Sequence, residues 1–357
     1  MSKLYPVGVQ NFEKVILGGY EYVDKTALIY QLFNTGSYYF LSRPRRFGKS
    51  LLLSTLEAYA QGKKELFKGL ALEKLEKDWT VYPVLHLDLN TQKYDTPESL
   101  TSILNDNLCI WESRYGARES ETSLSLRFQG IIRRACEQTG RRVVILIDEY
   151  DKPMLQAIGN EALQNEYRST LKAFYGALKS MDGCIRFALL TGVTKFGKVS
   201  VFSDLNNLMD ISMDDRYVEI CGISEKEIHT YFEEDIHALA TATGLTYEET
   251  CAELKSNYDG YHFTENAVGM YNPFSLLNTF AKKKFGSYWF ETGTPTYLVE
   301  LLKLHHYPIE ELEHIVTSQP VLDSIDTAST DPIPVIYQSG YLTIKGYNKM
   351  FENYTLG

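Results

Sequence analysis

Short apolar runs alternate with helical patterns through residues 38–221 of this chain of 357 residues. The apolar runs have the length of buried strands and lie at 38–41, 84–89, 143–147 and 185–190, with a weaker candidate at 217–221. The helical patterns between them lie at 50–61, about 96–111, 124–138 and 165–180. Because strand, helix and strand recur in this order, the sequence predicts an α/β fold with a mostly parallel sheet and flanking helices.

The pattern changes near residue 222, where we expect the first domain, residues 1–222, to end. Ser224 and Glu227 have the spacing of a capping box, at the start of a helix that we expect to reach about residue 241. Further helical patterns lie at 246–258, 273–284 and 295–304. Residues 223–310 are therefore predicted to form a mainly helical lid domain.

Strand-like segments return in the last part of the chain. They lie at 335–337, 341–345 and 351–356, and a turn around 346–349 joins the last two into a β-hairpin. Residues 311–357 are therefore predicted to form a small C-terminal region of strands. Because the last strand runs to Gly357, we expect the natural protein to continue into a further domain.

Charge and cysteine content argue against several classes of function. Lys and Arg number 36 against 46 Asp and Glu, which gives a net charge of −10. DNA binding by these residues should be weak or absent, because binding to a phosphate backbone needs clustered positive charge. The cysteines form no CxxC pair, which argues against a disulfide framework and a cysteine zinc site. Without a signal-peptide pattern or a long apolar run, we expect a cytoplasmic protein with no membrane contact.

The loop that follows the first apolar run ends with Gly48, Lys49 and Ser50. Such a loop, placed between a strand and a helix, binds phosphate through backbone N–H groups and the helix N-terminus. The general Walker A pattern GxxxxGK[ST] has a glycine where this chain has Arg43, so Pro44 would have to impose the turn. We expect nucleotide contacts from the loop and its flank, with Lys49 also acting in catalysis: Arg45, Arg46, Phe47, Gly48, Lys49, Ser50 and Leu51.

Two acidic residues, Asp148 and Glu149, directly follow the apolar run at 143–147. A buried parallel strand delivers such residues to the carboxyl edge of the sheet, where α/β proteins bind ligands. We expect Asp148 to bind Mg²⁺ together with the Ser50 hydroxyl, and Glu149 to act as the base that polarises the attacking water. The alternative is a helix N-cap followed by an acid in the first helical turn.

Threonines end the apolar run at 185–190. If this strand lies between the two strands that carry the loop and the acidic pair, Thr191 or Thr194 reaches the γ-phosphate as a sensor, and we expect Thr191 to act in catalysis. The alternative is an ordinary strand end with a polar turn.

Together these segments resemble the bacterial AAA-ATPase-like family. The resemblance rests on residues 42–51, Tyr22-Val-Asp-Lys-Thr, Ile147-Asp-Glu-Tyr-Asp-Lys-Pro, Thr191-Gly-Val-Thr-Lys-Phe and Ser203-Asp-Leu-Asn-Asn-Leu. An arginine at position 43 is usual in that family. The resemblance implies a P-loop ATPase similar to the archaeal and signal-transduction ATPases of the AAA+ class. Many members carry a nuclease-like domain of the PD-(D/E)XK type, which here would follow the family signature at 337–344.

Several further residues have weaker interpretations. Pro273 resembles a lid proline that packs near the adenine of a bound nucleotide, and it can equally be the first residue of a helix. Phe12 and Tyr22 can stack on a base, but we favour core packing for both. The histidines have no spacing typical of a metal site. Candidates for an arginine finger, each a solvated surface arginine by default, are Arg216, Arg186, Arg141 and Arg142.

The sequence favours a Mg²⁺-dependent ATP-binding protein that hydrolyses ATP slowly, as a switch or motor for an attached effector. The alternative is a scaffold or latch that holds ATP or ADP without turnover, within a larger nuclease-like DNA-processing protein. ATP is favoured over GTP because the chain lacks the Asn-Lys-x-Asp guanine signature. Whether the protein forms a homo-oligomer stays open, since a neighbouring subunit can supply an arginine to such a site.

Overall fold

A five-stranded parallel sheet lies at the centre of the molecule. The computed structural model describes residues 3–195, 201–203, 205, 207–266, 269–291, 296–305, 315–323 and 331–357. The sheet has the spatial order β2-β3-β4-β1-β5. Its strands are β1 (Tyr38–Ser42), β2 (Val84–Asp88), β3 (Val143–Asp148), β4 (Ile185–Gly192) and β5 (Met209–Asp210). The predicted parallel sheet is confirmed, and β4 lies between β1 and β3, as the sensor hypothesis requires.

The weaker strand candidate at 217–221 is wrong. This segment lies in a 3-10 helix, η4 (Asp215–Ile220), and the fifth strand of the sheet is the short β5. The Asp214 side chain caps η4 by accepting a hydrogen bond from the backbone N–H of Arg216. The apolar residues of the segment are buried by this helical turn rather than by strand pairing.

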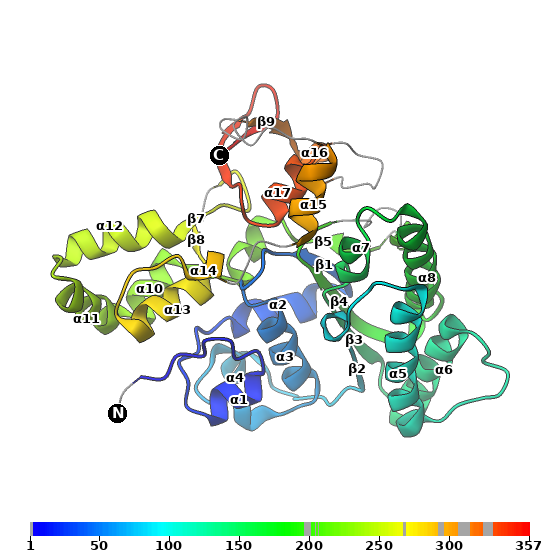
Figure 1. Cartoon of the computed structure of the whole chain (residues 1–357). Helices are drawn as coiled ribbons and strands as arrows, with labels where there is room; N and C mark the ends of the chain where they lie inside the picture. The colour runs from blue at the N-terminus through cyan, green and yellow to red at the C-terminus, as the bar shows by residue number, and fades with distance from the viewer. Residues whose placement is uncertain are drawn as a thin grey trace.

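Helices flank the sheet as the alternating pattern predicts. α3 (Lys49–Ala60) packs against β2, β3 and β4, while α5 (Pro97–Tyr115), α6 (Leu124–Thr139) and α8 (Glu161–Ser180) pack on one another beside the sheet (Figure 1). Every residue of β3 is buried, as expected for a central strand covered on both faces. Shorter elements complete this part: α1 (Phe12–Leu17), α2 (Thr26–Thr35), η1 (Lys64–Phe67), α4 (Ala71–Leu75), η2 (Leu89–Thr91), α7 (Lys152–Gln156) and η3 (Asp182–Cys184).

A mainly helical part follows η4 and extends from the side of the sheet opposite α5, α6 and α8 (Figure 1). It contains α10 (Glu225–Tyr231), α11 (Glu233–Thr243), α12 (Tyr247–Tyr258), α13 (Pro273–Lys282) and α14 (Tyr288–Glu291), and a small antiparallel sheet of β6 (Ile223–Ser224), β8 (Met270–Tyr271) and β7 (Asp259–Tyr261). The capping box of Ser224 and Glu227 is present. The single helix expected up to residue 241 is two helices, which meet at the fully buried Phe232.

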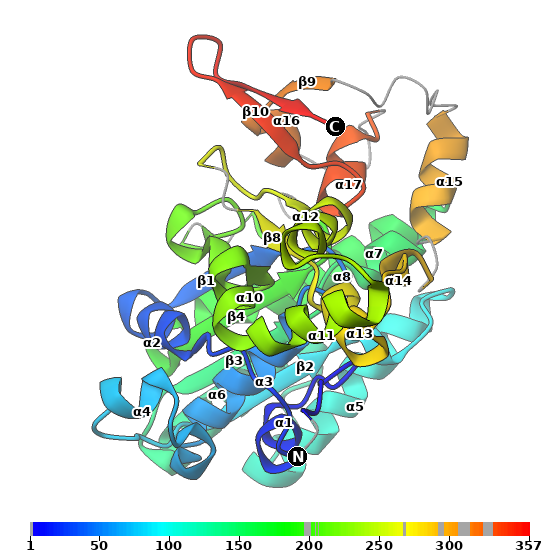
Figure 2. The same ribbon diagram turned by 90° about the vertical axis from the view of Figure 1, so that its left-hand side faces the viewer.

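The C-terminal elements lie above the central sheet in both views (Figures 1 and 2). They are α15 (Thr296–His305), α16 (Gln319–Asp323), α17 (Ile333–Gln338) and an antiparallel sheet of order β10-β11-β9, formed by β9 (Ile315–Ser318), β10 (Ile344–Asn348) and β11 (Asn353–Leu356). The predicted hairpin is confirmed, but its turn lies at 349–352 rather than around 346–349, because β10 continues to Asn348.

The strand expected at 335–337 is wrong, because these residues belong to α17, which has a proline in its first turn. The expected division into 1–222, 223–310 and 311–357 stays a prediction, and its second boundary falls outside the described residues. Across the described segments, no helix is both long and apolar enough to cross a membrane.

Candidate functional site

The loop between β1 and α3 presents an open helix N-terminus. Arg46 and Gly48 have the left-handed φ angles of 67° and 97° that curl the backbone before α3 begins at Lys49. Gly48 is the N-cap and supplies no side chain to the first N–H groups of the helix. These N–H groups have no partner within the helix either, so they are available to an anion.

The arginine that replaces the first Walker A glycine lies beneath the loop. The Arg43 side chain is buried, and its guanidinium lies 3.8 Å from the centre of the Phe263 ring. It donates to the carbonyl oxygens of Ser42 at 3.0 Å, Ser212 at 2.7 Å and Tyr217 at 3.2 Å. Burial lowers the pKa of Arg43 from its ordinary value. Arg43 therefore anchors the loop to the segments after β5 and does not narrow the space above it.

Lys49 lies inside the loop and faces the acidic pair. Its Nζ donates to the carbonyl oxygens of Arg43 at 3.1 Å and Pro44 at 3.4 Å, and lies 3.4 Å from Glu149 Oε1. Glu149 has a left-handed φ of 54°, a conformation that costs about 1–3 kcal/mol in a residue other than glycine and is often found at functional sites. The structure thus brings Lys49 and Glu149, two of the three residues expected to act in catalysis, into one ion pair.

The Asp148 carboxylate accepts a hydrogen bond from a hydroxyl group on each of two neighbouring elements. Ser50 Oγ, in the first turn of α3, donates to Asp148 Oδ2 at 2.6 Å. Thr191 Oγ1, at the end of β4, donates to Asp148 Oδ1 at 2.6 Å. The Ser50 hydroxyl and the Asp148 carboxylate are oxygen ligands of the kind that Mg²⁺ takes alongside phosphate oxygens and water, so the residues present fit such an ion.

Asp151 is a buried carboxyl group beside this cluster that the sequence analysis did not single out. It accepts hydrogen bonds from the Val193 N–H at 3.3 Å, from the Thr194 N–H at 2.7 Å and from Thr194 Oγ1 at 2.8 Å. Burial and the nearby charge of Glu149 raise the pKa of Asp151 to about 7. Thr194, the second sensor candidate, is thus engaged with Asp151 rather than with Asp148.

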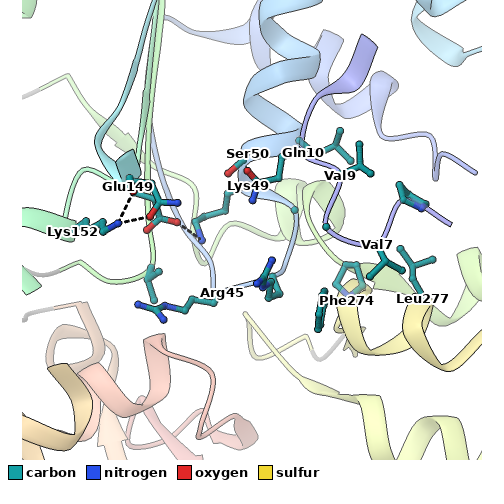
Figure 3. A pocket seen from close by; sticks show the side chains of 18 of the residues that line it. Val7, Val9, Gln10, Arg45, Lys49, Ser50, Glu149, Lys152, Phe274 and Leu277 are labelled. Carbon is teal, nitrogen blue, oxygen red and sulfur yellow. Dashed lines mark hydrogen bonds and ion pairs between the residues drawn. The ribbon is translucent and has the colours of Figure 1, made fainter. Parts of the chain in front are cut away.

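A pocket of about 550 Å³ lies over the loop (Figure 3). Cations line it on the loop side, and its only carboxylate among the described lining residues is Glu149. One end is apolar and is formed by the N-terminal segment and α13, while the other end lies beyond Glu149. The lining residues are Pro6, Val7, Gly8, Val9, Gln10, Arg45, Arg46, Gly48, Lys49, Ser50, Leu51, Asn90, Glu149, Lys152, Leu155, Gln156, Val193, Pro273, Phe274, Leu277 and Tyr297.

Pro273 lies in the first turn of α13, as its helical interpretation expects, and it also lines the pocket. Its packing near an adenine stays a prediction. The Phe47 side chain points elsewhere: it packs against Tyr261 and Phe263 and lines a smaller apolar pocket of about 90 Å³. Tyr22 lines that smaller pocket as well. Phe12 is fully buried against Phe67, in agreement with core packing.

The arginine-finger candidates lie away from the pocket. Arg216 pairs with Asp214 at 2.5 Å, and Arg186 lies over the Phe33 ring. Arg141 and Arg142 are exposed, and none of the four lines the pocket. Among the described histidines, His86 pairs with Glu57, and no group of three or more potential metal ligands of the His, Cys, Asp or Glu type forms in that part of the chain.

Lys152, Asn90 and the N-terminal residues 6–10 are pocket residues that sequence reasoning missed. Lys152 Nζ donates to the carbonyl oxygen and the side-chain oxygen of Asn90 at 2.7 and 2.6 Å. The sequence did contain an indication of this role for Lys152, because the residue belongs to the Asp-Lys-Pro segment shortly after the acidic pair. The N-terminal segment gave no comparable signal.

Two comparisons place the chain among known sequences. The family model described as Predicted AAA-ATPase matches residues 6–202, a span that contains the loop, the acidic pair and Thr191. A relative described as "Uncharacterized protein in vnfD 5'region", from Azotobacter chroococcum mcd 1, is 40% identical over 344 residues. The alignment covers 96% of this chain and 64% of the relative, so the chain spans less than two thirds of that protein.

Proposed function

We propose that this chain, which belongs to the AAA-ATPase-like family, binds ATP with Mg²⁺ and hydrolyses it slowly. One observation carries the proposal. Asp148 accepts hydroxyl hydrogen bonds from both Ser50 and Thr191, at the N-terminus of a helix whose first N–H groups are uncapped. A carboxylate and a hydroxyl beside an anion-binding loop are what a nucleotide with its divalent cation needs.

The loop side of the pocket is suited to the phosphates. Three cationic side chains from the loop and α3, Arg45, Arg46 and Lys49, line it together with the helix N-terminus, and these groups favour a polyanion. Mg²⁺ would be held by Ser50 and Asp148, where it would neutralise charge on the β- and γ-phosphates.

The apolar end of the pocket is suited to the base. Val7, Phe274 and Leu277 lie close together at this end and line it (Figure 3). The guanidinium of Arg46 lies 4.7 Å from the centre of the Phe274 ring and thereby connects the base end to the phosphate end. We propose that the adenine binds here, with Pro273 in the wall of the pocket.

Glu149 is proposed as the base that orients and polarises the attacking water. Its ion pair with Lys49 has a distance of 3.4 Å, so a γ-phosphate that attracts Lys49 would free the carboxylate for the water. Thr191 would act through Asp148, by holding the carboxylate in the orientation that faces Ser50.

The test is nucleotide binding and turnover measured on the same protein. Calorimetric titration with ATP, ADP and GTP in the presence of Mg²⁺ should show binding of ATP that Lys49→Ala abolishes. Glu149→Gln should bind ATP and lose phosphate release. Lys63→Ala is the matched control, because Lys63 forms an exposed 2.7 Å ion pair with Glu13 outside the pocket. No ATP binding by the parent protein would refute the proposal.

Tight binding without phosphate release would favour the alternative function, a latch that responds to ATP or ADP by domain rearrangement. In the whole protein we propose an ATPase core at 1–222, a helical lid at 223–310 and a small region at 311–357 that leads to an effector, for which a nuclease-like domain is our first candidate. We also propose that the protein can form a homo-oligomer and that this part of it binds DNA weakly or not at all.

A further inference from the structure

Two cations line the end of the pocket that lies beyond Glu149. Arg45 extends from the loop toward the side of Glu149 and Lys152, away from Phe274 and Leu277 (Figure 3). Lys152, the first residue of α7, lies on the other side of Glu149 and lines the same end. The uncharged residues around them are Asn90, Leu155, Gln156, Val193 and Tyr297.

Neither cation forms an ion pair in the part of the chain that the structure describes, although the charges of Glu149 and Asp88 act on Lys152 from a longer distance. Within the described segments, no carboxylate lies at ion-pair distance from Arg45 or Lys152, whereas Lys49 is paired with Glu149. The contacts of Lys152 are the two oxygens of Asn90, and partial burial lowers its pKa from the ordinary value. Arg45 is exposed and Lys152 is half-buried, and two cations that face one pocket attract an anion because opposite charges at short range stabilise each other.

Arg45 is held in place by residues far along the chain. Its guanidinium lies 5.8 Å from the centre of the Tyr297 ring in α15, and the Tyr297 hydroxyl shares a 2.8 Å hydrogen bond with Ser339 Oγ. The indole N–H of Trp289 donates to the Arg45 carbonyl oxygen at 3.3 Å. The position of this arginine therefore depends on α14 and on the C-terminal elements, although the residue itself belongs to the loop.

We propose that Arg45 and Lys152 act as catalytic residues that contact the γ-phosphate from the side opposite Lys49, so that one chain supplies its own arginine finger. This inference rests on the proposed ATP hydrolysis. In that reaction the water oxygen bonds to the γ-phosphorus, and the bond to the bridging oxygen breaks. The electron pair of that bond stays on ADP, and Glu149 accepts a proton of the water. Negative charge builds up on the departing ADP and the transferred phosphoryl group, where Arg45 and Lys152 neutralise it.

Tyr297 follows as a positioning residue. Its ring holds the Arg45 guanidinium, and its own hydroxyl is bound by Ser339. Tyr297→Leu should lower kcat and leave KM for ATP nearly unchanged, whereas Tyr297→Phe, which keeps the ring, should retain most of the parent kcat. A loss of kcat in Tyr297→Phe equal to that in Tyr297→Leu would contradict the role of the ring.

The decisive experiment measures phosphate release by single variants and by a mixture. Arg45→Ala should lower kcat about 100-fold, and Lys152→Ala should also lower it, both with a much smaller effect on the Kd for ATP than on kcat. Arg114→Ala is the matched control, because Arg114 is an exposed arginine that lies over a tyrosine ring outside the pocket. Equal kcat values for Arg45→Ala and the parent would overturn the inference.

The mixture separates action within one chain from action between chains. Arg45→Ala keeps an intact Lys49, and Lys49→Ala keeps an intact Arg45, so mixing them restores activity only if Arg45 acts on a neighbouring chain. We expect the mixture to give the sum of the two separate rates, and a higher rate would overturn the inference. A parent protein that releases no phosphate would overturn the proposed hydrolysis and this inference together. If the parent does release phosphate, the kcat values of the variants test this inference separately.

Discussion

The hydroxyl of Thr191 donates a 2.6 Å hydrogen bond to Asp148, across the two neighbouring central strands β4 and β3. Asp148 is buried, and its second carboxylate oxygen accepts from Ser50 at the start of α3. A strand end, a second strand end and a helix N-terminus thus meet at one carboxylate. The spatial order of the sheet produces this meeting, because β4 lies between the strand of the loop and the strand of Asp148.

Thr191→Val should lower turnover while ATP still binds. The substitution keeps the shape of the side chain and removes the donor to a buried carboxylate, a kind of hydrogen bond worth about 1.5–3 kcal/mol. Asp148 then loses one of the two hydroxyls that fix its orientation, and we expect phosphate release to fall about tenfold. Thr191→Ser, which keeps a hydroxyl, is the control. Equal rates for the valine variant and the parent would show that the bond has no part in catalysis.

Arg43→Gly, which restores the general Walker A residue, should destabilise the protein rather than improve binding. Arg43 donates to three carbonyl oxygens and packs on Phe263, so glycine leaves a cavity and unsatisfied acceptors. We expect a loss of about 3 kcal/mol in the free energy of unfolding. Urea unfolding measures it, with Arg43→Lys to separate the charge from the planar guanidinium. A glycine variant that is as stable as the parent and binds ATP more tightly would contradict this account.

The central strands could be predicted because burial on both faces makes their sequences apolar throughout. β3, buried at every position, is the clearest example. The same reasoning failed for α17, where the apolar residues 333–337 are buried on all sides of a short helix, so periodicity cannot distinguish it from a strand. β5 pairs through two residues, which is too short for any sequence pattern.

The loop and the acidic pair could be predicted because each carries its signal in consecutive residues. The direction of a side chain carries no such signal: Arg43 and Arg45 are two positions apart, yet one is buried beneath the loop and the other faces the pocket. The contribution of residues 6–10 and of Tyr297 arises from long-range packing, which brings both chain segments to the same cavity. Only the folded chain reveals these neighbours.

Asp151→Asn should change how stability depends on pH in the absence of nucleotide. The pKa of about 7 in the folded state lies above the ordinary value of 3.8, so between these values the folded state holds a proton that the unfolded state has released. This group therefore makes stability fall as pH rises through that window, by up to about 1.4 kcal/mol per pH unit. The asparagine variant does not titrate and should lose this contribution.

Urea unfolding of parent and variant at pH 5 and pH 7.5 checks this expectation. The stability of the parent should decrease relative to that of Asp151→Asn between the two pH values. Asp106→Asn, at an exposed aspartate of α5, serves as the control and should follow the parent. Parallel pH dependence for the parent and Asp151→Asn would show that Asp151 is already ionised in the folded protein at pH 5.

Lys195→Met should loosen the C-terminal elements from the sheet. Lys195 follows the end of β4, is almost completely buried, and pairs with Asp210 at 2.9 Å and with Asp323 of α16. Burial lowers the pKa of Lys195, but the two carboxylates outweigh burial and raise it overall. Removing the cation takes away the positive charge that compensates the partly buried carboxylates of Asp210 and Asp323, and we expect a loss of about 3 kcal/mol in the free energy of unfolding.

Lys195 is connected to the C-terminal elements through its side chain and through its backbone, and the substitution removes only the side-chain connection. The Lys195 backbone N–H also donates to Gln338 Oε1 at 2.5 Å, and Gln338 donates in turn to the Leu322 carbonyl oxygen. Because the ion pair with Asp323 is lost, limited proteolysis of Lys195→Met should cleave within α16 faster than in the parent, while the core stays intact. Lys195→Met combined with Asp323→Asn removes one orphaned charge and should recover part of the lost stability. A double variant less stable than Lys195→Met would contradict the electrostatic origin of the effect.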